Sequence, residues 1–359
     1  MRRWMSGILA ASIVALPLMA QDKAKDKAGD KSKERAEKFN AIVEDYKKAV
    51  PDVRKALQNA ETDKEREEIL EKLTKDFSPR ILKLVEADPK DEQSLEMLMF
   101  AVQALPKADG KVYDTLADNW ADNAKIKQLC QRMMFQPQEH AAKLLQKVLK
   151  DNKDKDTQGF ACYALAKIAA EKAGEKDKKA EAEAEKYYAR VVEDFADVSV
   201  GRNTKLGDLA KGSLFEIRNL GIGKKAPNVE SKNLDDKKVQ LSDYKGKVVV
   251  LDIWATWCGP CRAMIPHERE MVERLKDKPF ALISISADDE KKTLTDFLEK
   301  EKMPWTHWWT GTKGIVKDWN VQFFPTIYVI DAEGVIRHKN IRGDELEKAV
   351  VKLLGEKKK

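Results

Sequence analysis

The chain has 359 residues, and its 67 Lys and Arg against 61 Asp and Glu leave a formal net charge of +6 at pH 7. Charged residues make up 36% of the composition with acids and bases interspersed, so no long field of one sign indicates a nucleic-acid partner, and we expect none. Four cysteines in a chain of this length exclude a disulfide scaffold, and the length fits about two domains.

Residues 1–20, MRRWMSGILAASIVALPLMA, place two arginines before a short apolar stretch that ends near Pro17 and the small Ala20. This pattern is typical of a secretory signal peptide, so we expect export to the periplasm or another extracytoplasmic compartment. An uncleaved anchor is the alternative, and only then do we expect membrane association. The apolar run is shorter than the ~20 residues of a spanning helix.

Residues 21–37, QDKAKDKAGDKSKERAE, contain no aromatic or branched apolar residue, and we interpret them as a flexible charged spacer. From 38 to 220 apolar residues recur with a helical period, as in Leu145, Val148 and Leu149. Polar breaks divide this stretch into roughly eight to ten short helices. The helices form either a tetratricopeptide-like solenoid or an irregular bundle, because no repeat of fixed period is evident.

Two cysteines lie in this helical half, Cys130 in IKQLCQRMM and Cys162 in FACYALAKI. Both fall on apolar helix faces, where cysteine packs as a small hydrophobic residue, so we expect buried free thiols. One disulfide between neighbouring helices is the alternative, since an exported protein meets an oxidising compartment. No catalytic constellation is evident in this half.

From residue 222 to the end, short apolar runs alternate with helical segments, which predicts a second domain of the α/β class. KVVVLDIWA and FALISIS are β-branched and apolar on both faces, as buried parallel strands are. We expect helices over about 260–276 and 290–302 and at the C-terminus. PTIYVID and GVIRHKN add two antiparallel strands around a tight turn.

The segment LDIWATWCGPCRAMIPHE joins the first of these strands to a helix and contains two cysteines. Cys258 falls at the first turn of the helix, so unpaired backbone N–H groups and the helix dipole stabilise its thiolate, which is the nucleophilic form. Cys261 lies one turn later, close enough to resolve a mixed disulfide on Cys258. A zinc site needs about four ligands, and the other cysteines lie in the other half of the chain, so we expect no metal.

DIWATWCGPC, followed by Pro266 and later by FFPTIYVID, resembles the thioredoxin superfamily. The segment GKKAPNVESKNLDDKKVQLSDYKGKVVVLDIWATWC is similar to its exported branch, the TlpA/ResA-like thiol-disulfide oxidoreductases, also described as redoxin or AhpC/TSA-type domains. The resemblance covers about 222–357. It implies a thioredoxin-like fold and a Cys258–Cys261 disulfide that forms and breaks during turnover.

The family's reducing members share the Gly259–Pro260 pair, so the resemblance implies a reductant of disulfides in client proteins. No bound cofactor is implied. A reductant in an oxidising compartment also requires an electron donor, which we expect to be membrane-bound. The helical half is expected to select or position the client.

Around the cysteines the resemblance assigns further roles. Asp252 matches the family's buried carboxylate, which takes the proton of the second thiol, and burial should raise its pKa toward neutrality. An Asp at the solvent edge of the strand is the alternative. Phe324 and Pro325 match the family's Phe-Pro, with Pro325 as the cis-proline that faces the disulfide and leaves a backbone edge for an extended substrate. An ordinary trans proline is the alternative there.

Trp257, Gly259 and Pro260 are expected to shape the substrate surface, whereas Trp254 packs in the core. The sequence departs from the family at Met264, three residues after the second cysteine, where TlpA/ResA-like proteins often have Glu. We therefore expect the acid-base role to fall on Asp252 alone.

The aromatic segment MPWTHWWTG carries Trp305, Trp308 and Trp309 around His307. A substrate-binding patch is possible in principle, but aromatic residues at a strand edge more often serve packing, and we expect packing here. His267 follows the cysteines on the same helix, and we treat it as a surface residue.

Two other functions compete with the oxidoreductase. A thiol peroxidase of the peroxiredoxin kind requires Pro-x-x-x-Thr-x-x-Cys, but Leu251 and Ala255 occupy the Pro and Thr places, which predicts weak activity at most. The helical half is the larger one, so a binding or scaffold protein with an auxiliary thioredoxin-like domain is the other alternative.

Overall fold

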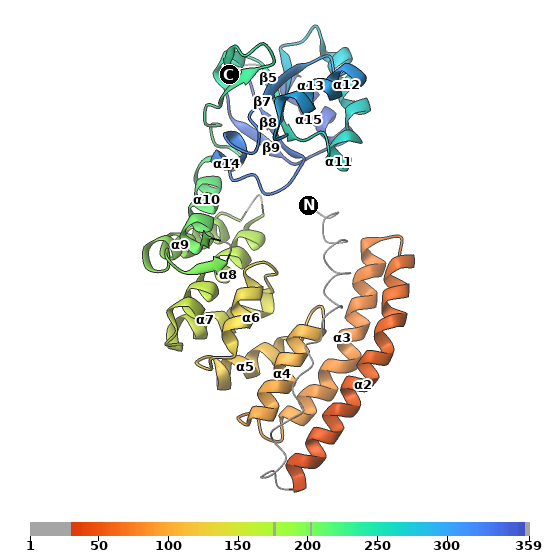
Figure 1. Cartoon of the computed structure of the whole chain (residues 1–359), viewed down its shortest axis with the longest axis vertical. Helices are drawn as coiled ribbons and strands as arrows, with labels where there is room; N and C mark the ends of the chain where they lie inside the picture. The colour runs from red at the N-terminus through yellow and green to blue at the C-terminus, as the bar shows by residue number, and fades with distance from the viewer. Residues whose placement is uncertain (1–29, 175–176, 202, 356–359) are drawn as a thin grey trace. The chain divides into compact units, whose positions relative to one another are not determined.

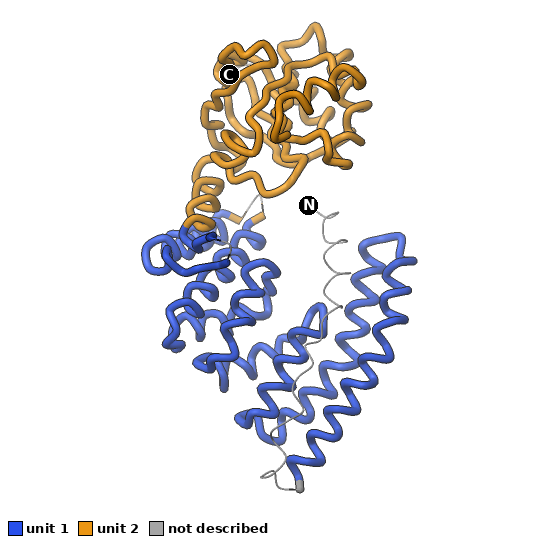
Figure 2. The backbone as a smooth tube through the Cα atoms, viewed as in Figure 1, with its two compact units in different colours: residues 1–173, 178–207 blue, residues 174–177, 208–359 orange. Residues whose placement is uncertain are grey.

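The computed structural model describes residues 30–174, 177–201 and 203–355 (Figure 1). The signal peptide predicted over 1–20 lies outside this range. Within the described ranges no helix combines the length and the apolar character that a membrane crossing needs. The chain divides into two compact units (Figure 2). The first holds the described residues up to Ala173 together with Lys178–Gly207, and the second holds mainly those from Asp208 onwards.

The first unit is helical, as predicted. Successive helices pack against one another, and several begin at a capping residue. At the start of α3, for example, the Thr62 hydroxyl accepts the Glu65 N–H at 3.2 Å, and the Glu65 carboxylate accepts the Thr62 N–H at 3.1 Å. The helices are α2 (Asp30–Asn59), α3 (Asp63–Val85), α4 (Glu92–Ala104), α5 (Gly110–Trp120), α6 (Ile126–Met133), the 3-10 turn η2 (Glu139–Ala141), α7 (Ala142–Asp151), α8 (Lys155–Ala173) and α9 (Lys178–Asp194).

The predicted flexible spacer is wrong from Asp30 onwards, because α2 already begins there. The Arg35 guanidinium is buried and forms an ion pair with Asp91. One turn earlier, the Gln93 side chain donates a hydrogen bond to the Ser32 carbonyl at 3.3 Å. These contacts with the start of α4 offset the entropy cost of ordering the segment, which its own side chains are too polar to offset by burial.

The two cysteines of the first unit are free and buried, which confirms their prediction as buried thiols. Cys130 lies in α6 and Cys162 in α8, two helices that pack together. Burial raises the pKa of each thiol to about 12. They therefore stay protonated and inert at neutral pH.

A short hairpin and one more helix lead into the second unit. The hairpin, β1 (Ser199–Gly201) and β2 (Thr204–Lys205), was not predicted. The helix α10 (Leu206–Asn219) groups with the second unit from Asp208 onwards. Phe215 on this helix and the following Leu220 pack into the core of the second unit. The predicted boundary between 220 and 222 therefore moves back to Gly207.

The second unit is built on one seven-stranded sheet with the strand order β4-β3-β7-β6-β5-β8-β9. Strands β5, β6 and β7 are parallel, and the strands on both sides of them are antiparallel. All of β5 and most of β6 are buried, as their continuous apolar character predicts. The strands are β3 (Glu230–Asn233), β4 (Lys238–Gln240), β5 (Val248–Trp254), β6 (Phe280–Ser286), β7 (Thr306–Trp309), β8 (Thr326–Ile330) and β9 (Ile336–Lys339).

Helices cover both faces of this sheet, which gives the α/β architecture that was predicted. On one face α12 (Ile265–Leu275) and α15 (Asp344–Gly355) pack on alternate residues of β5, including Val250. The helix α13 (Lys291–Lys300) lies over Trp254 on the same face. On the other face α10 and α14 (Ile315–Asp318) pack with Leu251. The turn η3 (Leu241–Tyr244) precedes β5.

The helix predicted over about 260–276 is split into α11 (Gly259–Arg262) and α12, with the interruption just before Pro266. A proline interrupts a helix in this way, because it lacks the N–H that an interior helical residue donates. The aromatic segment that includes β7 is a strand inside the sheet, with Trp308 and His307 buried. Its packing role is therefore confirmed over a substrate-binding patch.

Candidate active site

The two cysteines of the second unit form a disulfide immediately after β5. Cys258 caps the N-terminus of α11, and its Sγ is bonded to that of Cys261 at 2.03 Å. The backbone N–H of Cys261 donates a hydrogen bond to Cys258 Sγ at 3.2 Å. Both cysteines are buried, at 5% and 4% exposure. The pairing that the resemblance implied is confirmed.

Exposed residues surround the buried sulfurs. Trp257 is 68% exposed, although it is a large aromatic residue, and Gly259 and Pro260 are exposed beside it. The rings of Trp257 and Phe324 meet edge to face with centroids 5.7 Å apart, and Phe324 also packs against the cysteine cluster. The Phe324–Pro325 peptide is cis, so the trans alternative is wrong. The residues predicted to bind substrate are thus brought together around the disulfide.

Trp254, by contrast, belongs to the core, as predicted. It is 1% exposed and stacks edge to face on Phe297 of α13 with ring centroids 5.6 Å apart. Its position three residues before Trp257 explains the difference, because Trp254 is the last residue of β5 whereas Trp257 follows in the loop. The two tryptophans that flank the motif therefore have different roles.

Asp252 lies inside β5, on the face that α12 covers, and it is 4% exposed. Its predicted burial is confirmed, and the alternative position at a solvent edge is wrong. Burial raises the pKa of Asp252 to about 7, opposed by a hydrogen bond from Ser284 and by the charge of Arg342. The Ser284 hydroxyl donates to Oδ2 at 3.4 Å and itself accepts from Trp305 Nε1 at 2.9 Å. Such a carboxyl exchanges protons near neutral pH.

A second buried carboxyl, which the sequence analysis missed, lies near Asp252. Glu268 on α12 is 2% exposed, and burial together with the charge of Asp252 raises its pKa well above the usual range. Asp252 therefore has a second carboxyl as a neighbour, while its role as the only acid-base group stays a prediction. The signal was present in the sequence, because Glu268 falls on the apolar face of a helix between Ile265 and Met271.

A third buried carboxyl fixes the loop that carries the cysteines. Asp288, just after β6, accepts hydrogen bonds from the backbone N–H of Thr256 at 3.1 Å and from its hydroxyl at 2.7 Å. The Ser286 hydroxyl donates to its other oxygen at 2.7 Å. These bonds tie the loop just before Cys258 to the end of the neighbouring strand. The sequence offered no sign of this pairing, because its partners lie about thirty residues apart.

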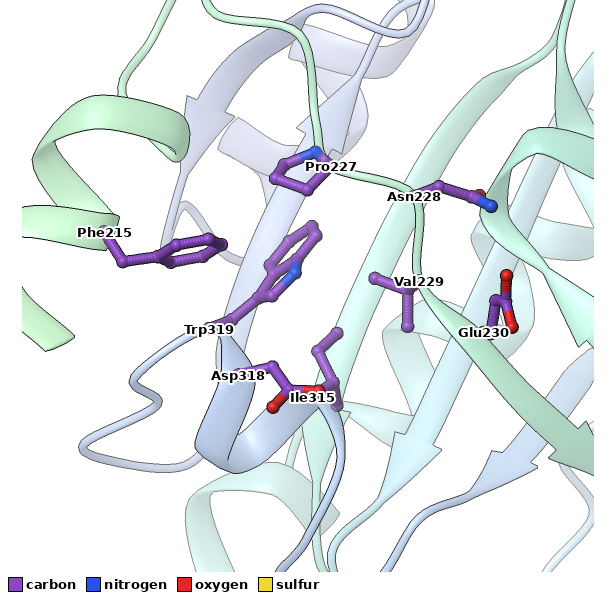
Figure 3. A pocket seen from close by; sticks show the side chains of 8 residues that line it. All are labelled: Phe215, Pro227, Asn228, Val229, Glu230, Ile315, Asp318 and Trp319. Carbon is purple, nitrogen blue, oxygen red and sulfur yellow. The ribbon is translucent and has the colours of Figure 1, made fainter.

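A cavity of about 520 Å³ lies on the opposite face of the sheet, between α10 and α14 (Figure 3). The rings of Phe215 and Trp319 point toward its centre, and Pro227 lies above them. Neither redox cysteine lines this cavity. This cavity is therefore separate from the disulfide.

Comparisons with known proteins agree with this geometry. A model described as the AhpC/TSA family matches residues 222–339. Thiol-disulfide oxidoreductase ResA of Bacillus thuringiensis subsp. konkukian is 30% identical over 146 residues, which cover 41% of this chain and 84% of that protein. The thioredoxin-like protein YneN of Bacillus subtilis is 36% identical over 128 residues, which cover 34% of this chain and 74% of that protein.

Among solved structures, the thioredoxin domain of a thiol-disulfide oxidoreductase from Bacteroides vulgatus is 31% identical. The match covers 38% of this chain and all of that domain, with a TM-score of 0.36. The residues matched by the family model, 222–339, all lie in the second unit.

Proposed function

Because the chain belongs to the ResA family of thiol-disulfide oxidoreductases through its second unit, we propose that it reduces disulfides of client proteins in an extracytoplasmic compartment. The observation that carries this proposal is the Cys258–Cys261 disulfide itself, which is bordered by an exposed aromatic surface and follows the strand that holds the buried Asp252. The Gly259–Pro260 pair between the cysteines favours the reducing direction.

The proposed cycle begins with the reduced pair. The Cys258 thiolate, stabilised by the N–H of Cys261, attacks one sulfur of the client disulfide and displaces the other as a thiolate. A mixed disulfide now joins Cys258 to the client. Cys261 loses its proton and attacks Cys258 Sγ, which releases the second client sulfur and closes the Cys258–Cys261 bond. Two electrons pass to the client, whose two thiolates take up two protons.

Asp252 is the proposed acceptor of the Cys261 proton. A carboxyl whose pKa is about 7 is partly ionised at neutral pH, so it both accepts a proton from a thiol and releases it again. The Arg342 guanidinium, which lowers the pKa of Asp252, also donates to the Pro325 carbonyl at 3.3 Å. This contact links the charge near Asp252 to the loop that is proposed to hold the substrate.

The client is proposed to bind as an extended segment over the exposed side of the disulfide. Trp257 and Phe324 supply an apolar surface, and Pro325 helps to leave a neighbouring backbone edge free for pairing. Gly259 presents no side chain there, and an added Cβ would meet no other atom within 4 Å, so the approach to Cys258 is open.

The location and the electron supply belong to the same proposal. The first twenty residues have the pattern of a secretory signal, which supports export. A reductant in an oxidising compartment must itself be reduced again, and we propose a membrane-bound dithiol donor for this step. The helical first unit is proposed to position clients.

The peroxidase alternative has little support. The two positions where that mechanism requires Pro and Thr are occupied by Leu251 and Ala255, and both side chains are completely buried and apolar. Neither offers a hydrogen bond to a peroxide oxygen. If the protein consumed hydrogen peroxide as fast as it reduces disulfides, the peroxidase alternative would be favoured.

The decisive experiment traps the client. In Cys261→Ala the mixed disulfide on Cys258 cannot be resolved, so clients stay attached and are identified after purification under non-reducing conditions. Cys162→Ala is the matched control, because that thiol is buried and inert, and it should trap nothing beyond the wild type. A Cys261→Ala protein that remains free under conditions where the wild type turns over contradicts the proposed order of attack.

A further inference from the structure

Glu268 lies near Asp252, and its buried position calls for an explanation. It is on the side of α12 that faces the sheet, where every other buried side chain is apolar: Ile265, Met271 and Leu275. The negative charge of Asp252 reaches Glu268, where it disfavours ionisation. A carboxyl in this position is costly unless it interacts with another polar group.

Both carboxyls have one oxygen that lacks a hydrogen bond. Among the described residues, neither Oδ1 of Asp252 nor Oε1 of Glu268 has a partner. A carboxylic acid that points its O–H at a carboxylate oxygen satisfies both atoms at once. Two neighbouring carboxyls in an apolar site resist losing both protons, so one proton remains with the pair.

We propose that protonated Glu268 donates a hydrogen bond to Oδ1 of Asp252 and so holds Asp252 as a carboxylate, ready to accept the proton of Cys261. This inference rests on the proposed role of Asp252 as the base. Glu268 touches no reacting atom and is a positioning residue that acts through Asp252. In each cycle the pair goes from one proton to two when Cys261 is deprotonated, and it returns to one when Asp252 releases that proton.

Substitutions at Glu268 leave the other charged and titratable groups around the pair in place. In the cross-strand register Asp252 pairs with Ser284, and Ser284 pairs with His307 on β7. Burial lowers the pKa of His307, whose Nε2 lies 3.0 Å from the Met303 carbonyl, so the imidazole is neutral at neutral pH. Arg342 lowers the pKa of Asp252, and the two redox cysteines on α11 are unchanged.

Two substitutions of the same residue test the inference. Glu268→Gln keeps an N–H donor of the same length, whereas Glu268→Leu removes the donor but suits the apolar face of α12, so both variants should fold. The measurement is the rate at which Cys261 resolves a mixed disulfide on Cys258, followed by stopped flow as a function of pH. Loss of the hydrogen bond disfavours the carboxylate of Asp252 and raises its pKa, so the acidic limb of the profile moves to higher pH.

For Glu268→Leu we expect a shift of about one pH unit and resolution about tenfold slower on the acidic limb, near about pH 6, while Glu268→Gln stays within about threefold of the wild type. An unchanged profile in Glu268→Leu would overturn the inference, since the side chain would then only fill space. A shift of both variants to lower pH would also overturn it, because that is the effect of removing an ionised, repelling Glu268.

Infrared spectroscopy of the oxidised protein gives a second readout that does not depend on activity. We expect the band of a buried protonated carboxyl to persist at about pH 8 in the wild type and to vanish in Glu268→Gln. Its absence from the wild type contradicts a protonated Glu268. Asp252→Asn separates the two proposals: if resolution and its acidic limb are unchanged in this variant, Asp252 is not the base, and the proposed function fails at that step whatever Glu268 does.

Discussion

Replacement of Asp252 by Asn should stabilise the second unit at neutral and alkaline pH, although it removes a proposed catalytic group. The pKa of Asp252 rises from 3.8 in the unfolded chain to about 7 in the folded protein. A carboxyl whose pKa is higher in the folded state than in the unfolded state stabilises the fold while it is protonated. This stability is fully present below the pKa of the unfolded state and is lost as the pH rises through the pKa of the folded state. About three pKa units at about 1.4 kcal/mol each give a loss of roughly 4 kcal/mol above neutral pH.

Urea unfolding of the oxidised protein at several pH values measures this loss. Tryptophan fluorescence reports mainly on the second unit, because six of the eight tryptophans lie after residue 250. Asn cannot ionise, so its own effect on packing is independent of pH. We therefore expect the difference between variant and wild type to grow by about 2 to 3 kcal/mol between about pH 5 and pH 8.

The control makes the same chemical change at Asp288, another buried carboxyl. Its oxygens accept hydrogen bonds from Thr256 and Ser286, so Asp288→Asn breaks bonds and should destabilise the protein by about 1 to 3 kcal/mol. Opposite signs for the two substitutions at about pH 8 are the expected result. If the difference between Asp252→Asn and the wild type is the same at every pH, the reasoning about the buried charge is refuted.

Three further outcomes are expected. Trp257→Ala should lower kcat/KM for folded client disulfides about tenfold yet leave reduction of a small aromatic disulfide nearly unchanged; equal losses for both would argue against a client-binding role. In the fully reduced native protein, iodoacetamide should modify neither Cys130 nor Cys162, as judged by mass spectrometry, because both thiols are buried with pKa values of about 12. A fragment 206–355, which keeps α10, should resist urea better than 222–355; equal midpoints would contradict the packing of α10 on this unit.

Local signals account for the predictions that were confirmed. A buried parallel strand is a continuous apolar run, so β5 and β6 stand out, and the cysteine pair follows β5 directly. The buried position of Asp252 was predictable for the same reason, because an acid inside a continuous apolar strand is buried together with its neighbours. The exposure of Trp257 follows from its place after the strand ends.

Contacts between distant segments account for what was missed. Residues 30–37 carry no apolar stripe that would predict a packed helix, and their contacts are with Asp91 and Gln93 at the start of α4. Strand β7 carries polar and aromatic residues in a short segment, and only its neighbours on both sides make it an inner strand. Glu268 is a different case, since the apolar stripe around it was visible and a search for charges on such stripes would have found it.

The buried carboxyls of Asp252 and Asp288 differ in how their oxygens are satisfied. Asp288 has hydrogen bonds to both oxygens and holds the loop before Cys258 in place, as a structural residue should. Asp252 and its neighbour Glu268 are both buried, and each has an oxygen that lacks a hydrogen bond unless the pair shares a proton, so their burial costs stability. A fold retains such a cost where function requires it, and the proposed transfer of the Cys261 proton to Asp252 is such a function.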